Sequence, residues 1–553
     1  MEKIPSFNQY IEDSVIKFWD KDAFTDYKGA TLQYHDVARK IEKLHIMFEN
    51  SGVKRGDKIA LCGRNSSHWA VAFLATLTYG AIAVPVQNEF TPEQIHNIVN
   101  HSESKLLFVG DVVCTQVNPD MMPALEGIVY LPDFSIVISR SEQLTFAREH
   151  LNEIFGKRYP KFFRKEHIHY YKEQSPEELA MINYTSGTTG FSKGVMLPYR
   201  ALWGNIDYVL KCLTPNVKPG SNLVSILPMA HMYGLAVEFL FGFINGCHLY
   251  FLNRMPSPSL IAEAFAEVKP RLIVAVPLVV EKIIRRKVLA EVQTNRMKLL
   301  LNMPVINKKI KQHIRDRIME AFGGNAYEII VGGAPLNQGI EEFLNSVGVP
   351  ITIGYGTTET APLITFANYD KYKIASCGPA VDHMEAKVVS PDPANVPGEL
   401  IAKGMNVMLG YYKNEEATNA VLDKDGWFHT GDLATMAPSG HIYIKGRIKN
   451  MLLGANGQNV YPEEIEDKLN NMPLVGESII IQRDTKLIAL VHPEIEDKEA
   501  MDFDDDDVKG IMDENLKTLN NQLPPFCKIA AIEIQKEEFQ KTAKKSIKRY
   551  LYK

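Results

Sequence analysis

The sequence predicts an α/β protein with two parts. The large N-terminal domain is expected to layer parallel or mixed sheets with helices and to include a β-rich subdomain, and a small α+β C-terminal domain is expected to follow. Strand-like and helical segments alternate over residues 1–110, which indicates crossover connections and a parallel sheet. Short strands and glycine turns dominate after Gly378, and the residues after 450 have an alternation of their own.

Composition narrows the class of protein. The chain has 553 residues, of which 45% are apolar and 23% charged, as in ordinary globular proteins. A net charge of -5 gives no reason to expect a nucleic acid partner. The six cysteines are scattered without the spacing of a zinc site, so a reduced, cytoplasmic location with free thiols is expected. The first residues lack the pattern of a signal peptide.

The first hundred residues are expected to form strands and helices in alternation. The predicted strands are 58–62, 81–86 and 105–109, and the predicted helices are 37–48, 69–79 and 92–100. The most apolar stretch, 69–86, contains Thr76, Thr78, Gly80 and Pro85. It therefore reads as a core helix, a glycine break and a buried strand rather than as a membrane span.

Two tracts are rich in basic residues. Residues 157–172 mix Lys and Arg with aromatic side chains, so they form either a solvated linker or a peripheral contact with a membrane or an anionic ligand. The second tract is 282–317; Ile310, Ile314 and Ile318, at its end, recur every four residues, which predicts an amphipathic helix. Packing of this helix against the protein's own core is favoured over membrane association.

A buried strand is expected at 180–184, and a loop rich in Ser, Thr and Gly follows it as far as Gly194. An apolar segment with helix formers comes after the loop. Clusters of this kind are often flexible surface turns. The alternative is a phosphate-binding loop, because glycines bring backbone N–H groups close to a phosphate and Lys193 adds charge. The spacing is not that of a Walker A loop.

Two later strands, 328–331 and 351–353, end in glycine-rich turns. Ligands of open α/β sheets bind beyond the carboxyl ends of strands, so these turns are expected to converge with the loop that precedes Gly194. The β-rich subdomain is placed at 378–447. The C-terminal domain, 451–553, is expected to contain helices at 462–470 and 508–519 and strands at 478–482, 487–491 and 530–534. The acidic run at 502–507 is expected to lie on a loop before the second helix.

Four motifs occur in a fixed order along the chain. They are Tyr184-Thr-Ser-Gly-Thr-Thr-Gly-x-x-Lys193-Gly194, Gly354-Tyr-Gly-Thr-Thr-Glu359, Trp427-Phe-His-Thr-Gly-Asp432 and Gly446-Arg447-x-Lys449. Together they resemble the adenylate-forming (AMP-binding) enzymes over nearly the whole chain. Within that superfamily the chain looks most like the long-chain fatty acid CoA ligases, because of Gly52-Val-x-x-Gly-Asp57-Lys58, Asn65-Ser-Ser-x-Trp69 and Asn406-Val-Met-x-Gly-Tyr411-Tyr412.

The resemblance implies a nucleotide site. Lys193 and the loop would hold the β- and γ-phosphates of ATP, Glu359 and Thr185 would bind Mg²⁺, and Tyr355 would stack on adenine. Asp432 would accept hydrogen bonds from both ribose hydroxyls. The remaining residues implied at the nucleotide are Ser186, Gly187, Thr188, Thr189, Gly190, Gly333, Ala334, Pro335, Gly356, Thr357, Thr358 and Arg447.

The resemblance also implies an acyl site beside His231. Amino-acid-activating relatives carry an aspartate near this position, whereas residues 227–234 contain no acidic residue. An uncharged acyl tail is therefore expected. Imidazole is suited to polar contact near neutral pH.

The small domain of this family rotates about a hinge, which the resemblance places at 448–450 with Lys449. The C-terminal family pattern Lys-Thr-x-x-Gly-Lys-Ile is altered here to Lys541-Thr-Ala-Lys-Lys-Ser-Ile547. Ser546 stands in the place of the catalytic lysine. Lys545 is assigned that role, with Lys548 as the alternative. Loss of such a cation typically slows a reaction by ~10²–10³-fold.

The expected activity is ATP- and Mg²⁺-dependent ligation of a medium- or long-chain fatty acid to CoA through an acyl-AMP. Two alternatives remain: transfer of the acyl group to a separate carrier protein, and a nucleotide- or acyl-CoA-binding protein that has lost catalysis. The expected location is cytoplasmic, with peripheral contact to the inner face of a membrane as an open alternative.

Overall fold

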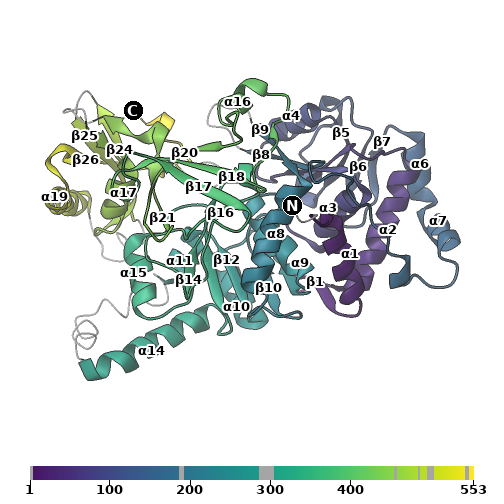
Figure 1. Cartoon of the computed structure of the whole chain (residues 1–553), viewed down its shortest axis with the longest axis horizontal. Coiled ribbons are helices and arrows are strands. Elements are labelled where there is room, and N and C mark those ends of the chain that lie inside the picture. Colours follow the sequence, from purple (N-terminus) through teal and green to yellow (C-terminus); the bar gives the residue numbers. More distant parts are fainter. Residues whose placement is uncertain are drawn as a thin grey trace.

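The computed structural model describes residues 4–185, 192–284, 304–453, 458–483, 486–494, 504–541 and 547–552. The order of elements is mixed α/β throughout, with several sheets and covering helices (Figure 1). The predicted fold class is therefore confirmed.

The first large sheet contains the parallel strands expected near the N-terminus. The described strands run in the order β19 (Gly410–Tyr411), β9 (Lys193–Pro198), β8 (Leu179–Thr185), β4 (Ile82–Val86), β3 (Lys58–Cys62), β5 (Ser104–Val109), β6 (Gly127–Tyr130) and β7 (Ile136–Ser139). Strands β8, β4, β3, β5 and β6 are parallel, and β9 returns antiparallel to β8.

The second large sheet carries both glycine-ended strands. Its described strands run in the order β14 (Ile351–Ile353), β13 (Glu328–Val331), β12 (Leu272–Ala275), β10 (Asn222–Ser225), β11 (His248–Phe251), β1 (Asp22–Asp26) and β2 (Thr31–Gln33). Strands β13 and β14 pair in parallel, with Val331 opposite Ile353. Their carboxyl ends therefore lie together.

Helix α3 (Ser67–Tyr79) contacts strands of both large sheets, β1 on one side and β3 and β4 on the other. Nearly all of its side chains are buried, and Trp69 stacks on Phe73 with ring centroids 5.4 Å apart. A helix that is apolar all round is a core helix or a membrane span. The structure shows the first, as the polar and glycine interruptions of 69–86 predict.

The remaining helices cover the sheets (Figure 1). In the N-terminal region they are α1 (Phe7–Lys17), α2 (Tyr34–Asn50), α4 (Pro92–Ser102), α5 (Asp111–Cys114), α6 (Glu142–Glu149), α7 (Leu151–Arg158), α8 (Tyr199–Leu213), α9 (Phe241–Ile244), α10 (Pro258–Val268), α11 (Pro277–Ile284), α14 (Pro304–Ala321) and α15 (Gln338–Ser346). A π-helix, η3 (Gly234–Leu240), precedes α9. In the described part of the chain, no helix combines the length and the apolar character needed to cross a bilayer.

The β-rich region forms an antiparallel sheet in the order β17 (Met384–Val389), β18 (Gly398–Gly404), β20 (Phe428–Met436) and β21 (Ile442–Arg447). Two short strands, β15 (Tyr355–Gly356) and β16 (Leu363–Thr365), pair separately, and α16 (Glu415–Asn419) follows β19.

The C-terminal elements gather at the yellow end of the molecule (Figure 1). They are β22 (Leu452–Leu453), β23 (Asn459–Val460), α17 (Pro462–Asn470), α19 (Asp505–Gln522) and a sheet of β24 (Val475–Arg483), β25 (Lys486–Pro493) and β26 (Ile529–Ile534). They have their own apolar core, in which Leu469, Ala489 and Leu519 are buried. Asp504 caps α19, so most of the acidic run forms the first turn of that helix and not only the loop before it.

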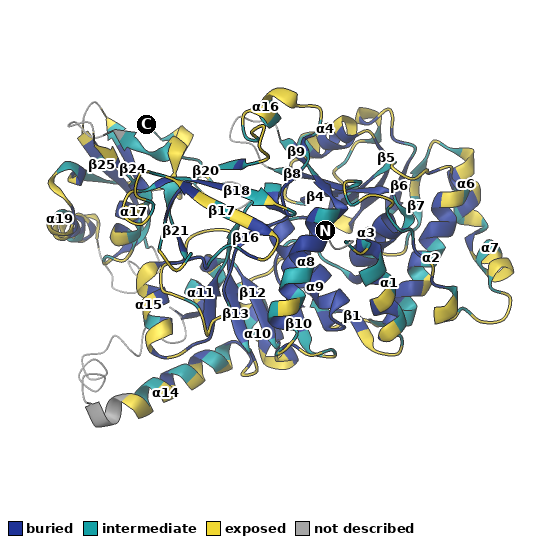
Figure 2. Ribbon diagram, viewed as in Figure 1, coloured by how far each residue is buried: buried dark blue, intermediate teal, exposed yellow. Residues whose placement is uncertain are grey.

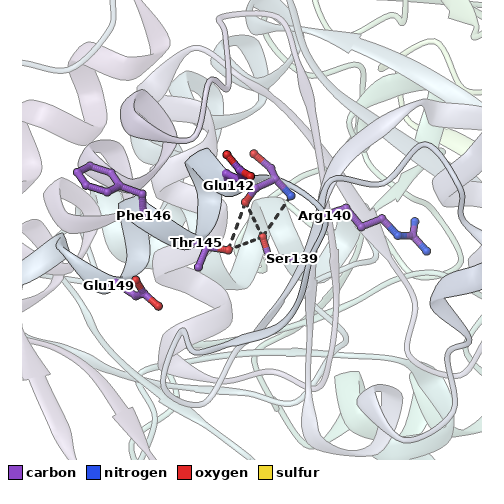
Figure 3. Close-up of a pocket in the computed structure, with 7 residues that line it drawn as sticks. Ser139, Arg140, Glu142, Thr145, Phe146 and Glu149 are labelled. Carbon is purple, nitrogen blue, oxygen red and sulfur yellow. Dashed lines mark hydrogen bonds between the residues drawn. The ribbon is translucent and has the colours of Figure 1, made fainter.

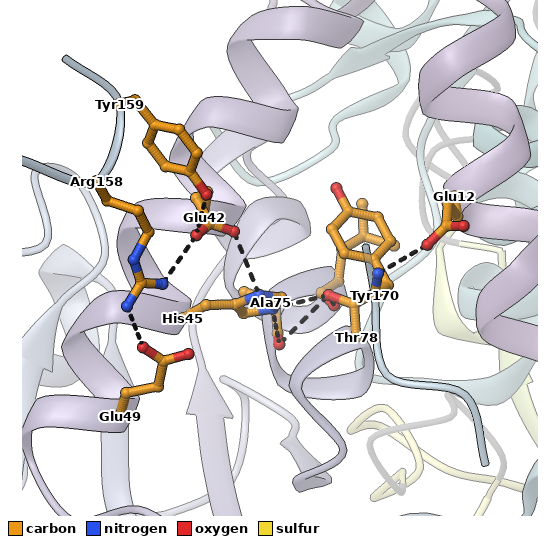
Figure 4. Close-up of polar contacts among 10 residues, drawn as sticks. Glu12, Glu42, His45, Glu49, Ala75, Thr78, Arg158, Tyr159 and Tyr170 are labelled. Carbon is orange, nitrogen blue, oxygen red and sulfur yellow. Dashed lines mark hydrogen bonds and ion pairs between the residues drawn. The ribbon is translucent and has the colours of Figure 1, made fainter. Parts of the chain in front are cut away.

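The structure corrects two local expectations. The apolar segment after the loop begins as strand β9 and becomes helical only at α8, because residues 193–198 pair with β8. The 157–172 tract is not simply solvated. Arg158 bonds to Glu42 and Glu49 (Figure 4), and Tyr170 is buried. Figure 2 shows the burial of each element.

The amphipathic helix of the second basic tract corresponds to α14. Ile314 and Ile318 are buried in the protein's own core, which confirms the favoured interpretation. Residues 285–303 of that tract lie outside the described residues.

Candidate functional site

The predicted phosphate loop connects the paired strands β8 and β9. Thr185 ends β8 and lies opposite Lys193, the first residue of β9. Ser186, Gly187, Thr188, Thr189 and Gly190 lie outside the described residues, so their contact with phosphate stays a prediction.

Lys193 and Glu359 meet at a tyrosine that the sequence reasoning assigned to no role. The ammonium of Lys193 lies over the Tyr411 ring, 4.7 Å from its centroid. The Tyr411 hydroxyl donates to Glu359 Oε1 at 2.9 Å. Tyr411 is placed by β19, which pairs with β9 opposite Val195. The sequence feature that could have indicated a role for Tyr411 is its position in residues 406–412, one of the motifs that carry the family resemblance.

A second group of predicted residues meets at Asp432. The Tyr355 hydroxyl donates to Asp432 Oδ2 at 2.5 Å, and Arg447 Nε lies 3.3 Å from Oδ1. Asp432 and Arg447 are opposite each other on β20 and β21. Burial raises the pKa of Asp432, while the charge of Arg447 and the hydrogen bond from Tyr355 oppose that rise. The charge of Glu359 adds to the rise in the pKa of Asp432.

The glycine turns lie at one edge of the second sheet. Gly354 N donates to Val331 O, which brings the chain leaving β14 next to the end of β13. Gly333 has φ +84°, a conformation that favours glycine, and Gly333, Ala334 and Pro335 are exposed there. A Cβ on Gly356 would lie 1.7 Å from the carbonyl oxygen of Pro362, so only glycine fits at that position.

The residues between Gly356 and Glu359 form a tight turn into the short helix η5 (Thr358–Thr360). Thr357 N donates to the Thr360 hydroxyl at 3.1 Å. Thr358 is buried. The helix η5 packs against β9, so Thr357, Thr358 and Glu359 lie beside the strand that begins with Lys193.

The His231 segment is held by two asparagines. Asn183 of β8 donates to Ala230 O at 2.9 Å. Asn65 donates to Leu227 O at 2.6 Å and accepts from Met229 N at 2.9 Å. His231 Nδ1 accepts from Tyr233 N at 3.3 Å. The segment beside His231 is therefore fixed to the strand that ends at Thr185.

Glu238 is a buried carboxyl that sequence reasoning missed. It lies in the π-helix η3 and accepts from Ser225 Oγ, Ile226 N and Leu227 N at 3.1 to 3.3 Å. Burial raises its pKa to about 8, against the opposing effect of these three donors. It holds the chain that leads from β10 into the His231 segment. π-Helices are frequent at functional sites, so the π-helix η3 is the structural feature that draws attention to Glu238.

The predicted hinge lies in a short 3₁₀ helix, η6 (Ile448–Asn450), in which Lys449 is exposed. Asn450 donates to Glu463 Oε1 of α17 at 2.6 Å, which links the hinge to the C-terminal elements. Lys545 and Ser546 lie outside the described residues, so the identity of the catalytic lysine stays a prediction.

The oxygen donors proposed for Mg²⁺ fit that ion. Mg²⁺ is usually held by one or two carboxylates together with substrate phosphates, and Glu359 and Thr185 supply a carboxylate and a hydroxyl. Among the described residues, no cluster of three or more His, Cys, Asp or Glu side chains has the arrangement of a metal site.

Two surface cavities lie apart from these residues. One, of about 460 Å³, is lined by Ser139, Arg140, Ser141, Glu142, Thr145, Phe146 and Glu149 (Figure 3). There the Ser139 hydroxyl is already bonded to Thr145 and to the backbone of Ser141. The second, of about 410 Å³, is lined by residues of α2, α6 and α7 and of the turn between β6 and β7, and four of these residues are basic.

Known proteins resemble this chain over almost all of its length. Residues 11–412 match the AMP-binding enzyme family, and residues 449–552 match the AMP-binding enzyme C-terminal domain. The chain is 30% identical over 507 residues to a long-chain-fatty-acid–CoA ligase of Escherichia coli O6:H1, covering 86% of this chain and 82% of that relative. It is 24% identical over 515 residues to the human long-chain-fatty-acid–CoA ligase ACSBG2, covering 87% and 75%.

Solved structures share the fold. ATP-bound MatB from Rhodopseudomonas palustris superposes with a TM-score of 0.76 at 23% identity, covering 99% of this chain and 98% of that one. The anthranilate CoA ligase AuaEII in complex with anthranoyl-AMP superposes with a TM-score of 0.78 at 18% identity, covering 99% and 97%. Because the family match spans most of the sequence and the fold agrees end to end, the chain belongs to the AMP-binding enzyme family.

Proposed function

We propose that this protein is an acid–CoA ligase that activates a medium- or long-chain fatty acid with ATP. In the first half-reaction a carboxylate oxygen of the acid attacks the α-phosphorus, and the bond to pyrophosphate breaks. In the second, the CoA thiol attacks the acyl carbon of the acyl-AMP and AMP leaves. The observation that carries the proposal is that residues of the four motifs meet in two groups: Lys193 and Glu359 at Tyr411, and Tyr355 and Arg447 at Asp432.

The first half-reaction brings an anion to a polyanion, so positive charge is needed at the phosphates. Lys193 lies where the predicted loop returns to the sheet and would supply part of that charge. Glu359 and Thr185 would hold Mg²⁺, which supplies charge neutralisation as a Lewis acid when bound. Asp432 and Arg447 would orient the ribose, and Tyr355 would pack on adenine against Gly333, Ala334 and Pro335. A C-terminal lysine, for which we propose Lys545, would complete the site.

The substrate class follows from the segment beside His231. Residues 227–234 offer no acidic side chain to an ammonium group, and the buried carboxyl of Glu238 accepts from the backbone amides of Ile226 and Leu227. An apolar acyl chain suits these surroundings. Relatives named for long-chain fatty acids support the same choice. A cytoplasmic location and domain limits of 1–447 and 451–553 on either side of the hinge belong to the same proposal.

The test is AMP formation measured with a panel of acids from acetate to palmitate, with and without CoA and with EDTA added. Turnover is expected to require CoA and Mg²⁺ and to rise with chain length. The Glu359→Gln variant should lose activity. The control variant is Glu103→Gln. It changes a surface carboxylate that also accepts a hydrogen bond from a tyrosine, Tyr412, and it should retain activity. Absence of CoA-dependent turnover with every acid would refute the proposal, and activity only with a phosphopantetheinylated carrier protein would redirect it.

A further inference from the structure

A second cavity lies at the end of the molecule opposite the C-terminal elements, between α2 and the α6–α7 pair (Figure 1). Its volume is about 410 Å³. Its lining residues are Arg39, Lys40, Lys43, Leu44, Asp133, Phe134, Arg148, Leu151 and Asn152. Four cations therefore face one carboxylate in a single cavity.

Most of these cations are bonded to neutral groups. Lys40 Nζ donates to His68 Nε2 at 3.0 Å, Lys43 Nζ donates to Asn152 Oδ1 at 2.8 Å, and Arg148 Nε donates to Phe134 O at 2.8 Å. Within the described residues, none of these three forms an ion pair with a carboxylate. Arg39 differs, because it pairs with Asp36 on its own helix.

The acidic side chains nearest in sequence are already engaged. Glu42 and Glu49 of α2 bond to Arg158, and Glu42 also accepts from the Tyr159 hydroxyl (Figure 4). Asp133 lines the cavity; its Oδ1 accepts from Ser135 N at 2.8 Å, and the charge of Arg148 also acts on it. The four cations of the cavity therefore outnumber the carboxylates that face them, Asp133 in the lining and Asp36 beside Arg39, so net positive charge remains.

The charges also act on one another. Burial lowers the pKa of Lys40, and the charges of Lys43 and Arg39 lower it further, against the opposing effect of Asp36. Burial likewise lowers the pKa of Lys43, as do the charges of Arg39 and Arg148. An anion placed among these groups would relieve that repulsion.

We propose that this cavity binds a phosphate-bearing anion, held by Lys40, Lys43 and Arg148. Guanidinium and ammonium groups together are well suited to phosphate, the first as a planar fork and the second as a point charge. The cavity contains no residue predicted for the nucleotide or the acyl chain, so this site is separate from the proposed reaction.

Two sources of the phosphate share this chemistry: a soluble phosphate and a lipid headgroup. The second deserves a test because Phe162, 72% exposed, lies between the exposed Lys161 and Arg164 near the cavity. Its neighbour Phe163 packs on Phe155, with ring centroids 5.6 Å apart, and Lys43 Nζ lies 5.3 Å from the Phe155 centroid.

The experiment measures binding of inorganic phosphate to the full chain by calorimetry at constant ionic strength. The double variant Lys43→Ala/Arg148→Ala should bind at least ~10-fold more weakly than the wild type, since it removes two charge-assisted hydrogen bonds to the anion. The matched control Lys509→Ala/Lys517→Ala removes two exposed charges from α19 and should bind like the wild type. The Lys193→Ala variant removes a cation of the predicted nucleotide loop, so it distinguishes phosphate bound at that loop from phosphate bound in the cavity.

Phosphatidylcholine vesicles with and without phosphatidic acid identify the source. Loss of phosphatidic acid-dependent binding in the cavity variant would assign a lipid headgroup, and loss of phosphate binding alone would assign a soluble ligand. Equal binding by the cavity variant and the control in both assays, or loss confined to Lys193→Ala, would overturn the proposal. If the alanine variant fails to fold, Lys43→Gln/Arg148→Gln replaces it in both assays. Its fold is checked by circular dichroism and by its melting temperature.

Discussion

Replacing Tyr411 by Phe tests the part of the site that sequence reasoning did not find. The change removes the hydroxyl that donates to Glu359 at 2.9 Å and keeps the ring under the Lys193 ammonium. We expect acyl-AMP formation to slow about 10-fold, with a larger Mg²⁺ requirement and little change in fold.

The magnitude follows from the bond that is lost. A hydrogen bond to a charged group contributes about 1.5–3 kcal/mol, and each 1.4 kcal/mol is tenfold in rate, which gives a range of roughly 10- to 100-fold. Because Tyr411 is buried but Glu359 is only half-buried, water replaces part of the interaction, and the lower end of the range applies.

Pyrophosphate release without CoA, with hydroxylamine to trap the acyl-AMP, isolates this step. The neighbouring variant Tyr412→Phe is the matched control, because its hydroxyl donates to Glu103 at 3.0 Å on the surface. It should retain the wild-type rate. Equal rates for the two variants would show that the Tyr411 hydroxyl does not position Glu359.

Three further predictions follow from the same contacts. Burial raises the pKa of Glu238 from 4.5 to about 8, so the folded chain binds more protons between these values, and Glu238 lowers the free energy of unfolding by up to ~1.4 kcal/mol per pH unit as pH rises. Glu238→Gln should remove this contribution to the slope, and a pH-independent difference between variant and wild type in urea titrations would contradict it. Asp432→Asn should raise the KM for ATP about 10-fold or more, since its contact with Arg447 loses its charge; an unchanged KM in steady-state assays would remove Asp432 from the nucleotide site. Asn65→Ala deletes its contacts with Leu227 and Met229 and should lower kcat/KM for the fatty acid more than for ATP, with ~1–3 kcal/mol lost in stability; equal losses for both substrates would indicate a general structural role.

The sequence predicted many elements closely. Strands 58–62, 328–331 and 351–353 have the predicted bounds, because short apolar runs between turn residues define their own ends. The strand at 193–198 was not recognised. Its conformation is set by pairing with β8, and the local sequence there is equally compatible with the start of a helix.

Contacts of the candidate site could be anticipated only where residues stand in ordered motifs. Asp432 and Arg447 belong to such motifs, and the structure brings them together with Tyr355. Tyr411 lies 52 positions from Glu359, and Asn65 lies 164 positions from Met229. No periodicity or spacing indicates contacts of that range, because they depend on how the two large sheets are placed.

Strand β8 has a consequence for the proposed chemistry. Its last residue, Thr185, opens the predicted phosphate loop, and Asn183, two residues earlier, holds the backbone beside His231. ATP and the acid, the two reactants of the first half-reaction, would thus both be positioned by the same short stretch of backbone. Reacting atoms must approach to about 3–3.5 Å for efficient reaction, and a common anchor makes that separation insensitive to where the C-terminal domain stands. Rotation of that domain could then exchange the catalytic lysine for the CoA thiol without disturbing the acyl-AMP.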